Sequence, residues 1–154
     1  MAVHERKPPP WEELFLLQAK VVAERSKNPG TRHGALLVNA DNVVLSQGFN
    51  GPPRRFPDHK INWQHPSRHD YVIHAEENAI LFGLALHGDV VGSTLYVTGR
   101  PCARCVRLAV HMALRRIVFG GVESSMADSK DWELALRMAL WGQLHLKEYG
   151  SNAV

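Results

Sequence analysis

The spacing of hydrophobic positions changes several times along this chain, and each spacing predicts an element. Apolar residues near the start recur at helical intervals, which predicts an amphipathic helix over residues 11–26. Two short apolar runs, 35–38 and 43–46, flank a polar turn and predict a β-hairpin. The helix should bury one stripe against the sheet: Trp11, Leu14, Phe15, Gln18, Val21 and Val22.

The second half of the chain alternates between helical and strand patterns. Three helices are predicted, from His74 to His87, from Cys102 onwards, and over residues 129–140. Strands are predicted at 94–98, 116–119 and 143–148. Helices that alternate with strands after one opening hairpin predict an α/β fold, a three-layer α/β/α sandwich around a mixed five-stranded sheet.

Residues 51–70 form a long stretch without a predicted element. They hold four prolines and three histidines, and loops of this length in a compact domain are functional or disordered. Phe56 and Trp63 argue against pure disorder, so we expect this segment to lie over the mouth of a site. Residues 1–10, which end in three prolines, should be a flexible tail before a single domain over 11–150.

Composition narrows the class of protein. With 45% hydrophobic and 21% charged residues, the chain is typical of soluble globular proteins, and no apolar run approaches the ~20 residues that span a bilayer. A net charge of +3 favours anionic small molecules but is weak for a nucleic-acid binder. Two cysteines three positions apart suit metal binding in a reducing compartment, so we expect a cytoplasmic protein.

The candidate chemistry lies in two short motifs, His74 with Glu76 and Cys102 with Cys105. One imidazole and two thiols give three ligands for tetrahedral zinc and leave a fourth position for water. Glu76 is near enough to move that water's proton without being a ligand. Both motifs open predicted helices, whose N-termini stabilise thiolates. Glu77, rotated about 100° from Glu76, should be a solvated surface charge or a partner contact.

Together the H-x-E and P-C-x-x-C motifs are the signature of zinc deaminases. They occur in family order with Gly-Phe-Asn-Gly at 48–51, close to a Gly-Tyr-Asn-Gly motif. Over residues 11–149 the chain therefore resembles the deoxycytidylate (dCMP) deaminases of the cytidine deaminase superfamily. The resemblance implies a zinc-dependent hydrolase that converts dCMP to dUMP and ammonia for dTTP biosynthesis. It implies one catalytic zinc per chain, held by His74, Cys102 and Cys105, with Glu76 as the proton carrier.

The same resemblance implies further contacts. Asn50 would bond the sugar 3′-hydroxyl, Ser26 would lie near the 5′-phosphate, and the backbone of Ala75 would meet the pyrimidine carbonyl. Family members are commonly homo-oligomers, often hexamers, that dCTP activates and dTTP inhibits. Their effectors contact the loop that corresponds to residues 48–54.

The chain departs from the family in three places. Many relatives bind a second zinc through cysteines before the catalytic histidine, and this chain has none there. Asp58, His59, His65 and His69 could replace them, but exposed loop histidines are the favoured interpretation, so we expect no second, structural zinc. Residues 124–128 lack the aromatic-basic pair with which some relatives grip phosphate. Arg100 stands where relatives have an apolar or small residue, and could alter what the pocket accepts.

Several alternatives follow from these departures. Candidate phosphate or effector contacts are Lys27, Arg32, Arg54, Arg55 and Arg100, with plain surface charge as the alternative. The substrate could instead be a free base, a nucleoside or a 5-substituted cytosine nucleotide. A nucleic-acid-editing or nucleic-acid-binding protein is disfavoured, because the sequence has no basic-aromatic run. His33 is expected to be a structural histidine, with substrate contact as the rival role.

Overall fold

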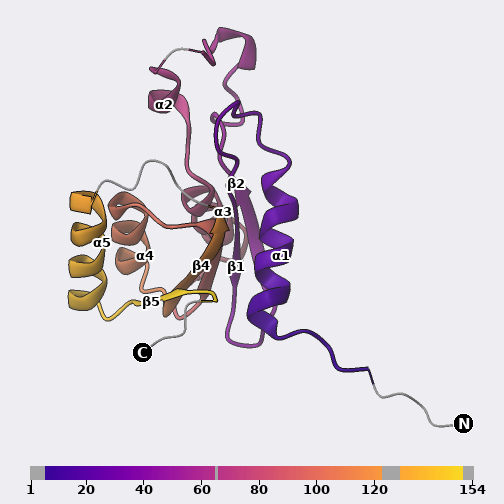
Figure 1. The fold of residues 1–154 in the computed structure, drawn as a ribbon, viewed down its shortest axis with the longest axis vertical. Helices are drawn as coiled ribbons and strands as arrows, with labels where there is room; N and C mark the ends of the chain where they lie inside the picture. Colours follow the sequence, from indigo (N-terminus) through magenta and orange to yellow (C-terminus); the bar gives the residue numbers. More distant parts are fainter. Residues whose placement is uncertain (1–5, 65, 123–128, 151–154) are drawn as a thin grey trace, which may run out of the picture.

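The computed structural model describes residues 6–64, 66–122 and 129–150, and it contains the predicted mixed sheet. Figure 1 shows α1 on one face of the sheet and α3, α4 and α5 on the other. The strand order is β2-β1-β3-β4-β5, in which β1 is antiparallel to its two neighbours and β3, β4 and β5 are parallel. The strands are β1 (Gly34–Val38), β2 (Val44–Phe49), β3 (Thr94–Gly99), β4 (Arg116–Val122) and β5 (His145–Glu148). The predicted three-layer α/β/α sandwich is therefore confirmed.

Four helices lie close to their predicted positions, whereas α2 and a 3-10 turn occur in the segment for which no element was predicted. They are α1 (Trp11–Ala23), α2 (Arg68–Tyr71), α3 (Ala75–His87), α4 (Ala103–His111) and α5 (Ser129–Trp141), with a 3-10 turn, η1 (Asp58–Lys60). Gly88 ends α3 with a positive φ of 73°, a conformation that glycine adopts without strain. None of the helices in the described ranges is long and apolar enough to span a bilayer.

The predicted burial of α1 is partly wrong. Its buried residues are Phe15, Leu16, Ala19 and Ala23, whereas Trp11 and Val21 are 54% and 68% exposed. Close packing on β1 accounts for the buried alanines, since a Cβ at Gly34 would lie 2.0 Å from the carbonyl oxygen of Ala19. Small side chains let the helix approach the strand, and hydrophobicity alone does not report size.

Helix α3 lies directly on β2 because one glycine leaves room for it. A Cβ at Gly48 would lie 2.3 Å from the carbonyl oxygen of Ala75 and 2.5 Å from the amide nitrogen of Ala79. Ser46 strengthens the contact by donating its hydroxyl to the Ala79 carbonyl at 2.5 Å. This packing places the start of α3 at the end of β2.

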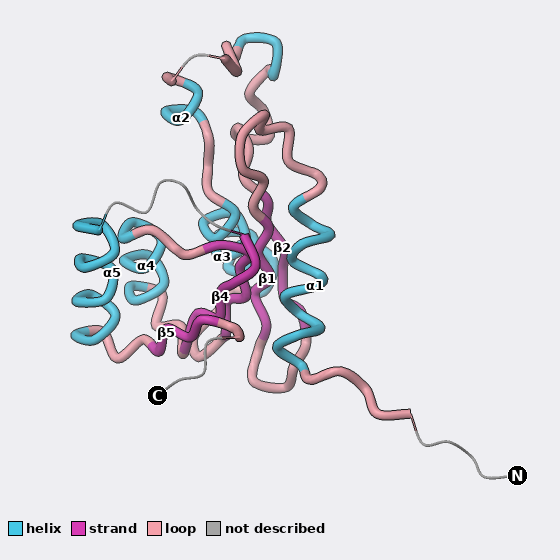
Figure 2. Tube along the Cα trace, viewed as in Figure 1, coloured by secondary structure: helices cyan, strands magenta, loops and turns pink. Residues whose placement is uncertain are grey.

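The prediction that residues 51–70 lie over the mouth of the site holds only for the end of the segment. In Figure 2 the segment that contains η1 and α2 extends beyond the sheet. The rings of Phe56 and Tyr71 pack together at 5.2 Å, and Gly51 forms an isolated bridge with Ile73 that closes the segment's base. Only its last part returns to the site described below.

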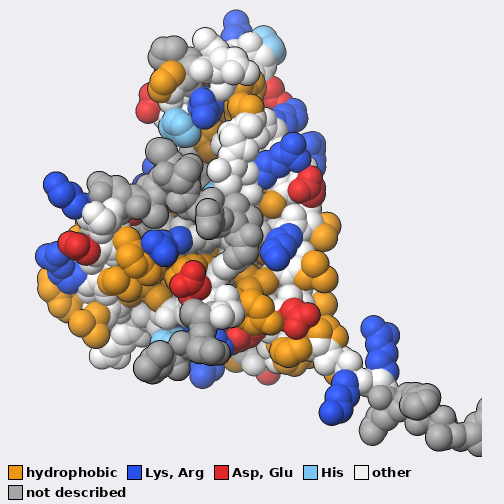
Figure 3. Space-filling model, in the orientation of Figure 1, with side chains coloured by type: hydrophobic (Ala, Val, Ile, Leu, Met, Phe, Trp, Pro, Cys, Tyr) orange, Lys and Arg blue, Asp and Glu red, His pale blue; other side chains and the backbone are white. Residues whose placement is uncertain are grey.

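Exposed apolar side chains remain on two outer helices. Figure 3 shows hydrophobic side chains on one face of the molecule, including the outer sides of α1 and α5. On α5, Leu140 and Trp141 are 76% and 75% exposed, so they are not core residues. Trp132 instead packs edge-on against Phe119 at 5.7 Å.

Candidate active site

Three predicted ligands converge at the N-termini of two helices. His74 precedes α3, Cys102 precedes α4, and Cys105 lies in the first turn of α4. The Nδ1 of His74 is 3.5 Å from the Sγ of Cys102 and 3.4 Å from that of Cys105, and the sulfurs are 3.6 Å apart. A tetrahedral zinc with two sulfur ligands and one nitrogen ligand separates such atoms by roughly 3.5–3.8 Å. The donor set and its spacing therefore fit zinc.

The electrostatics of this group favour a metal that binds thiolate. The hydrogen bond that Cys102 shares with Cys105, and after it the one shared with His74, lowers the pKa of Cys102 to about 3. The hydrogen bond to Cys102 raises the pKa of His74. One thiolate thus forms readily at Cys102, as expected beside a helix N-terminus. Zinc is bound by thiolates and a neutral imidazole. Its binding therefore releases the protons that the two cysteines and the His74 imidazole still carry.

Glu76 is buried beside the three ligands. Its side chain belongs to the cavity wall, and only 5% of the residue is exposed. Burial raises its pKa to about 7, against a smaller lowering by His74. A carboxyl group with a pKa near neutrality can both accept and return a proton.

Of the two roles predicted for Glu77, a solvated surface charge or a partner contact, the first is wrong. Its Oε2 accepts a hydrogen bond from the backbone N–H of His74 at 3.0 Å and pairs with Arg104 at 3.0 Å. The first turn of a helix leaves backbone N–H groups without partners, and a glutamate at its third position can satisfy one. Glu77 thereby ties the His74 backbone to α4, which carries both cysteines.

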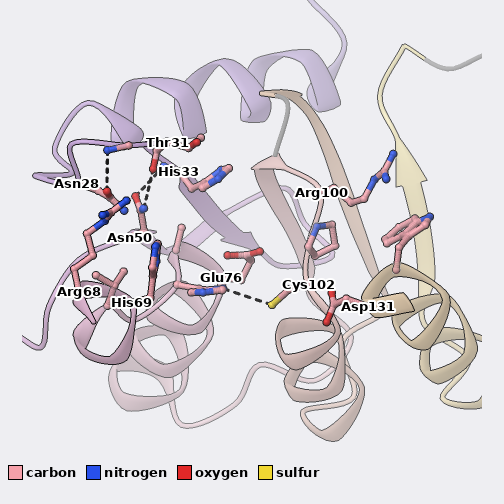
Figure 4. A pocket seen from close by; sticks show the side chains of 16 residues that line it. Asn28, Thr31, His33, Asn50, Arg68, His69, Glu76, Arg100, Cys102 and Asp131 are labelled. Atoms are coloured by element: carbon pink, nitrogen blue, oxygen red, sulfur yellow. Dashed lines mark hydrogen bonds between the residues drawn. The ribbon is translucent and has the colours of Figure 1, made fainter. Parts of the chain in front are cut away.

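A cavity of about 280 Å³ opens next to these residues. Its reacting centre consists of His74, Glu76, Cys102 and the adjoining Cys105. Figure 4 shows two flanks on opposite sides of Glu76 and Cys102. The Arg68 flank contains Asn28, Gly30, Thr31, Asn50, Arg68 and His69; the Asp131 flank contains Arg100, Asp131 and Trp132.

Asn50 organises the loop on the Arg68 flank. Its Oδ1 accepts from the backbone N–H of His33 at 2.8 Å, and its Nδ2 donates to the carbonyl of Thr31 at 3.0 Å. Ser26 is buried behind this wall, where its hydroxyl donates to the Asn50 carbonyl at 2.7 Å and accepts from the N–H of Asn28 at 3.2 Å. Asn50 and Ala75 line the cavity, whereas Ser26 supports the wall from behind; their contacts with a substrate stay predictions.

The structure brings one of the candidate cations to the cavity. Arg100 lines it, with its guanidinium 4.8 Å from the ring of Trp132. Lys27 instead pairs with Asp58, Arg32 pairs with Glu24 at 2.9 Å, and Arg54 lies over Phe82 at 3.9 Å. None of these three side chains lines the cavity, and Arg55 is exposed.

Several cavity residues were missed by the sequence interpretation. Arg68 and Val72 come from the end of the irregular segment and the residues just after it, and no local motif marks them; His69, considered only as a metal ligand, lies beside them on the wall. Asp131 begins α5, and its Oδ2 accepts from the backbone N–H of Ala103 at 2.9 Å, which caps α4. His33 also lines the cavity, with Nδ1 3.3 Å from the hydroxyl of Thr98, and burial lowers its pKa.

A second metal site was not expected. Across the described ranges, His74, Cys102 and Cys105 are the group of three whose ligand atoms lie within 4.8 Å of one another. Asp58 is occupied by Lys27, and both His59 and His69 are exposed. His65 lies outside the described residues, as do the altered residues 124–128. A single zinc per chain stays a prediction.

Comparisons with known proteins agree with this geometry. The profile of the cytidine and deoxycytidylate deaminase zinc-binding region matches residues 9–121. The deoxycytidylate deaminase of Homo sapiens is 33% identical over 115 residues, which is 71% of this chain and 64% of that protein. The deoxycytidylate deaminase of Mycobacterium phage D29 is 32% identical over 124 residues, which is 72% of this chain and 94% of that protein. The chain thus spans about two thirds of the mammalian relatives' length.

Solved structures show the same fold. The dCMP deaminase of cyanophage S-TIM5 superimposes with a TM-score of 0.72 at 20% identity, over 92% of this chain and 99% of that one. A second structure of the phage enzyme, in complex with dCMP and dUMP, gives a TM-score of 0.71. The family profile covers the helix–strand segments that carry every ligand found above. This chain belongs to the family of the cytidine and deoxycytidylate deaminase zinc-binding region.

Proposed function

We propose that this protein is a zinc-dependent hydrolase that converts dCMP to dUMP and ammonia. The observation that carries the proposal is Glu76, a buried carboxyl group with a raised pKa that lies beside a zinc-type ligand set on a cavity wall. A closed structural zinc site needs no such acid. The deoxycytidylate deaminase relatives supply the substrate class.

The chain's own residues support the required proton transfers. Zinc, when held by His74, Cys102 and Cys105, acidifies a water molecule and polarises it for attack. Glu76 accepts the proton that the water loses as its oxygen bonds to C4 of the cytosine. The same carboxyl group gives this proton to ring N3, then takes the remaining hydroxyl proton and passes it to the amine, which leaves as ammonia as the C4 carbonyl forms. Glu77 and Asp131 hold the two helix starts so that this geometry persists.

The cavity supports specific contacts with the nucleoside. Each end of the Asn50 amide makes one hydrogen bond and retains capacity for another, so it can still contact the sugar 3′-hydroxyl. The backbone of Ala75 remains the candidate contact for the pyrimidine carbonyl. Ser26 acts indirectly by fixing the positions of Asn50 and Asn28.

The test is ammonia release from dCMP by the zinc-loaded protein, with the dUMP product and the zinc content measured in parallel. Stoichiometric dUMP and ammonia with about one zinc per chain is the expected result. Absence of both products from a protein that holds one zinc would contradict the proposal. Adding dCTP or dTTP to the same assay tests whether triphosphates change turnover.

A second candidate substrate is a free base, a nucleoside or a 5-substituted cytosine nucleotide. Lys27, Arg32 and Arg54 are engaged away from the cavity, which favours a substrate with less phosphate than the sequence implied. A panel of cytosine, guanine, deoxycytidine, dCMP and 5-substituted dCMP decides between the classes. A higher kcat/KM on any other member than on dCMP would establish the second candidate.

We also propose a cytoplasmic homo-oligomer. The exposed Leu140 and Trp141 on α5 support an interface between copies, because large apolar side chains are costly to leave in water. Two free thiols that bind a metal need a reducing compartment. Light scattering of the zinc-loaded protein should give a mass above the 17.2 kDa of one chain.

A further inference from the structure

Arg68, a half-buried residue of the cavity wall, has one guanidinium nitrogen without a hydrogen-bond partner among the described residues. It lines the cavity at the start of α2, and its Nε is buried without a hydrogen-bond partner. The ion pairs found in the described ranges do not include it. A buried donor without a partner costs free energy, so an arginine in this state is suited to an acceptor that comes from a ligand.

The surroundings of Arg68 are already ordered. A Cβ on Gly30 would lie 3.7 Å from the Nη2 of Arg68, so the guanidinium stands close to the loop of residues 28–31. That loop is fixed by hydrogen bonds from Gly30 N–H to Asn28 Oδ1 at 3.0 Å and from Asn50 Nδ2 to the Thr31 carbonyl at 3.0 Å. Figure 4 shows Arg68 and Asn28 together on this flank. A ligand group placed here needs little rearrangement of the wall.

The two flanks differ in charge. The acidic residues that line the cavity are Glu76, in the reacting centre, and Asp131, on the opposite flank. Arg100 on the Asp131 flank is exposed, and its guanidinium lies over the Trp132 ring. The Asp131 flank therefore carries one charge of each sign, whereas the Arg68 flank carries a positive charge with no acidic lining residue, so an anionic group is attracted more strongly to the Arg68 flank.

We propose that Arg68 binds the phosphate monoester of the substrate and thereby selects a nucleotide over its nucleoside. This inference rests on the proposed function, which places the cytosine amine at Glu76. The sugar then lies beside Asn50, and the phosphate reaches the guanidinium beyond it. Arginine suits this role because its planar fork donates two parallel hydrogen bonds to phosphate oxygens.

The experiment compares kcat/KM on dCMP and on deoxycytidine for the wild type, Arg68→Gln and Arg68→Lys. Arg68→Gln should lose roughly 10- to 100-fold on dCMP, the range of a charged hydrogen bond, and less than about 3-fold on deoxycytidine. The kcat/KM of Arg68→Lys on dCMP should lie between those of the wild type and Arg68→Gln, because lysine keeps the charge but not the planar fork. Arg115→Gln, an exposed arginine before β4, is the matched control and should change neither value.

Other outcomes would overturn the assignment. If Arg68→Gln loses kcat/KM equally on dCMP and deoxycytidine, Arg68 has a structural role. If neither value changes, Arg68 does not take part in substrate recognition. Arg100→Gln tests the opposite flank. If Arg100→Gln abolishes the preference for dCMP while Arg68→Gln keeps it, the phosphate lies on the Asp131 flank.

A binding measurement separates this inference from the proposed function. If the wild type deaminates neither substrate, the proposed function fails, and 2-deoxyribose 5-phosphate is titrated into the zinc-loaded protein by calorimetry. Binding by the wild type with at least about 10-fold weaker binding by Arg68→Gln supports a phosphate site at Arg68. No binding, or equal binding by both proteins, overturns it.

Discussion

The reacting centre and the Arg68 flank line the same cavity, but different kinds of structure hold them. His74, Cys102 and Cys105 stand at helix N-termini that pack on the sheet. The Arg68 flank consists of a loop and a short helix that extends beyond the core. Backbone packing fixes the reacting centre, whereas hydrogen bonds of the Ser26, Asn28 and Asn50 side chains fix the Arg68 flank.

This difference matches what each region must do. Bond making requires atoms held in a narrow range of positions, which helices packed on a sheet provide. Recognition of a substrate's outer groups tolerates more variation and is commonly carried by loops. The reacting centre should therefore be sensitive to single atoms, and the Arg68 flank to charge.

The largest effect should follow removal of a metal ligand. Cys105→Ala leaves one thiolate and one imidazole, so zinc content should fall from about one per chain to near zero, and ammonia release should disappear with it. Atomic absorption and the dCMP assay measure the two quantities. Arg107→Gln, an exposed substitution on the same helix, should keep both. Full activity in a zinc-free Cys105→Ala protein would refute the metal assignment.

The next effect separates two adjacent glutamates. Glu76→Gln removes the proton carrier, so kcat on dCMP should fall by roughly 10²- to 10⁴-fold while zinc content is retained. Glu77→Gln keeps an oxygen that can accept from His74, so its kcat should change by less than about 5-fold. Near-normal ammonia release from zinc-loaded Glu76→Gln would rule out Glu76 as the proton carrier.

A third substitution tests the packing that places the reacting centre. Gly48→Ala puts a methyl group 2.3 Å from the Ala75 carbonyl, against backbone that cannot rotate away. It should lower the free energy of unfolding by about 1–3 kcal/mol and reduce zinc retention. Gly51→Ala, in the same motif, meets only the ring of Phe49 at 3.6 Å and should be tolerated. Equal denaturation midpoints for the two variants would contradict this packing argument.

The smallest effect concerns the cap of α4. Asp131→Ala removes the acceptor for Ala103 N–H, which should cost about 0.5–2 kcal/mol and weaken zinc retention against a chelator. Asp131→Asn keeps an acceptor oxygen, so its losses of stability and of zinc retention should be smaller. Glu133→Ala, exposed on the same helix, is the control. If Asp131→Ala holds zinc as firmly as the control does, the cap does not position the cysteines.

Much of the fold followed from local patterns. Gly88 after an apolar helical stretch marked the end of α3, and the two apolar runs around residues 39–42 marked the hairpin. The reacting centre was also predictable, since H-x-E and P-C-x-x-C place their side chains by short-range helix geometry. The buried face of α1 was not predictable in this way, because it depends on the close contact between Ala19 of the helix and Gly34 of β1.

The sequence by itself determined which residues can hold zinc and which carboxyl group can move a proton. Those roles depend on side-chain chemistry and on spacings of two or three residues. Only the tertiary structure decided which cations line the cavity. Lys27, Arg32 and Arg54 contact other side chains away from the cavity, whereas Arg68, from an irregular segment, lines the cavity wall. Charge placement over long sequence separations depends on which surfaces fold together, and no local pattern encodes that.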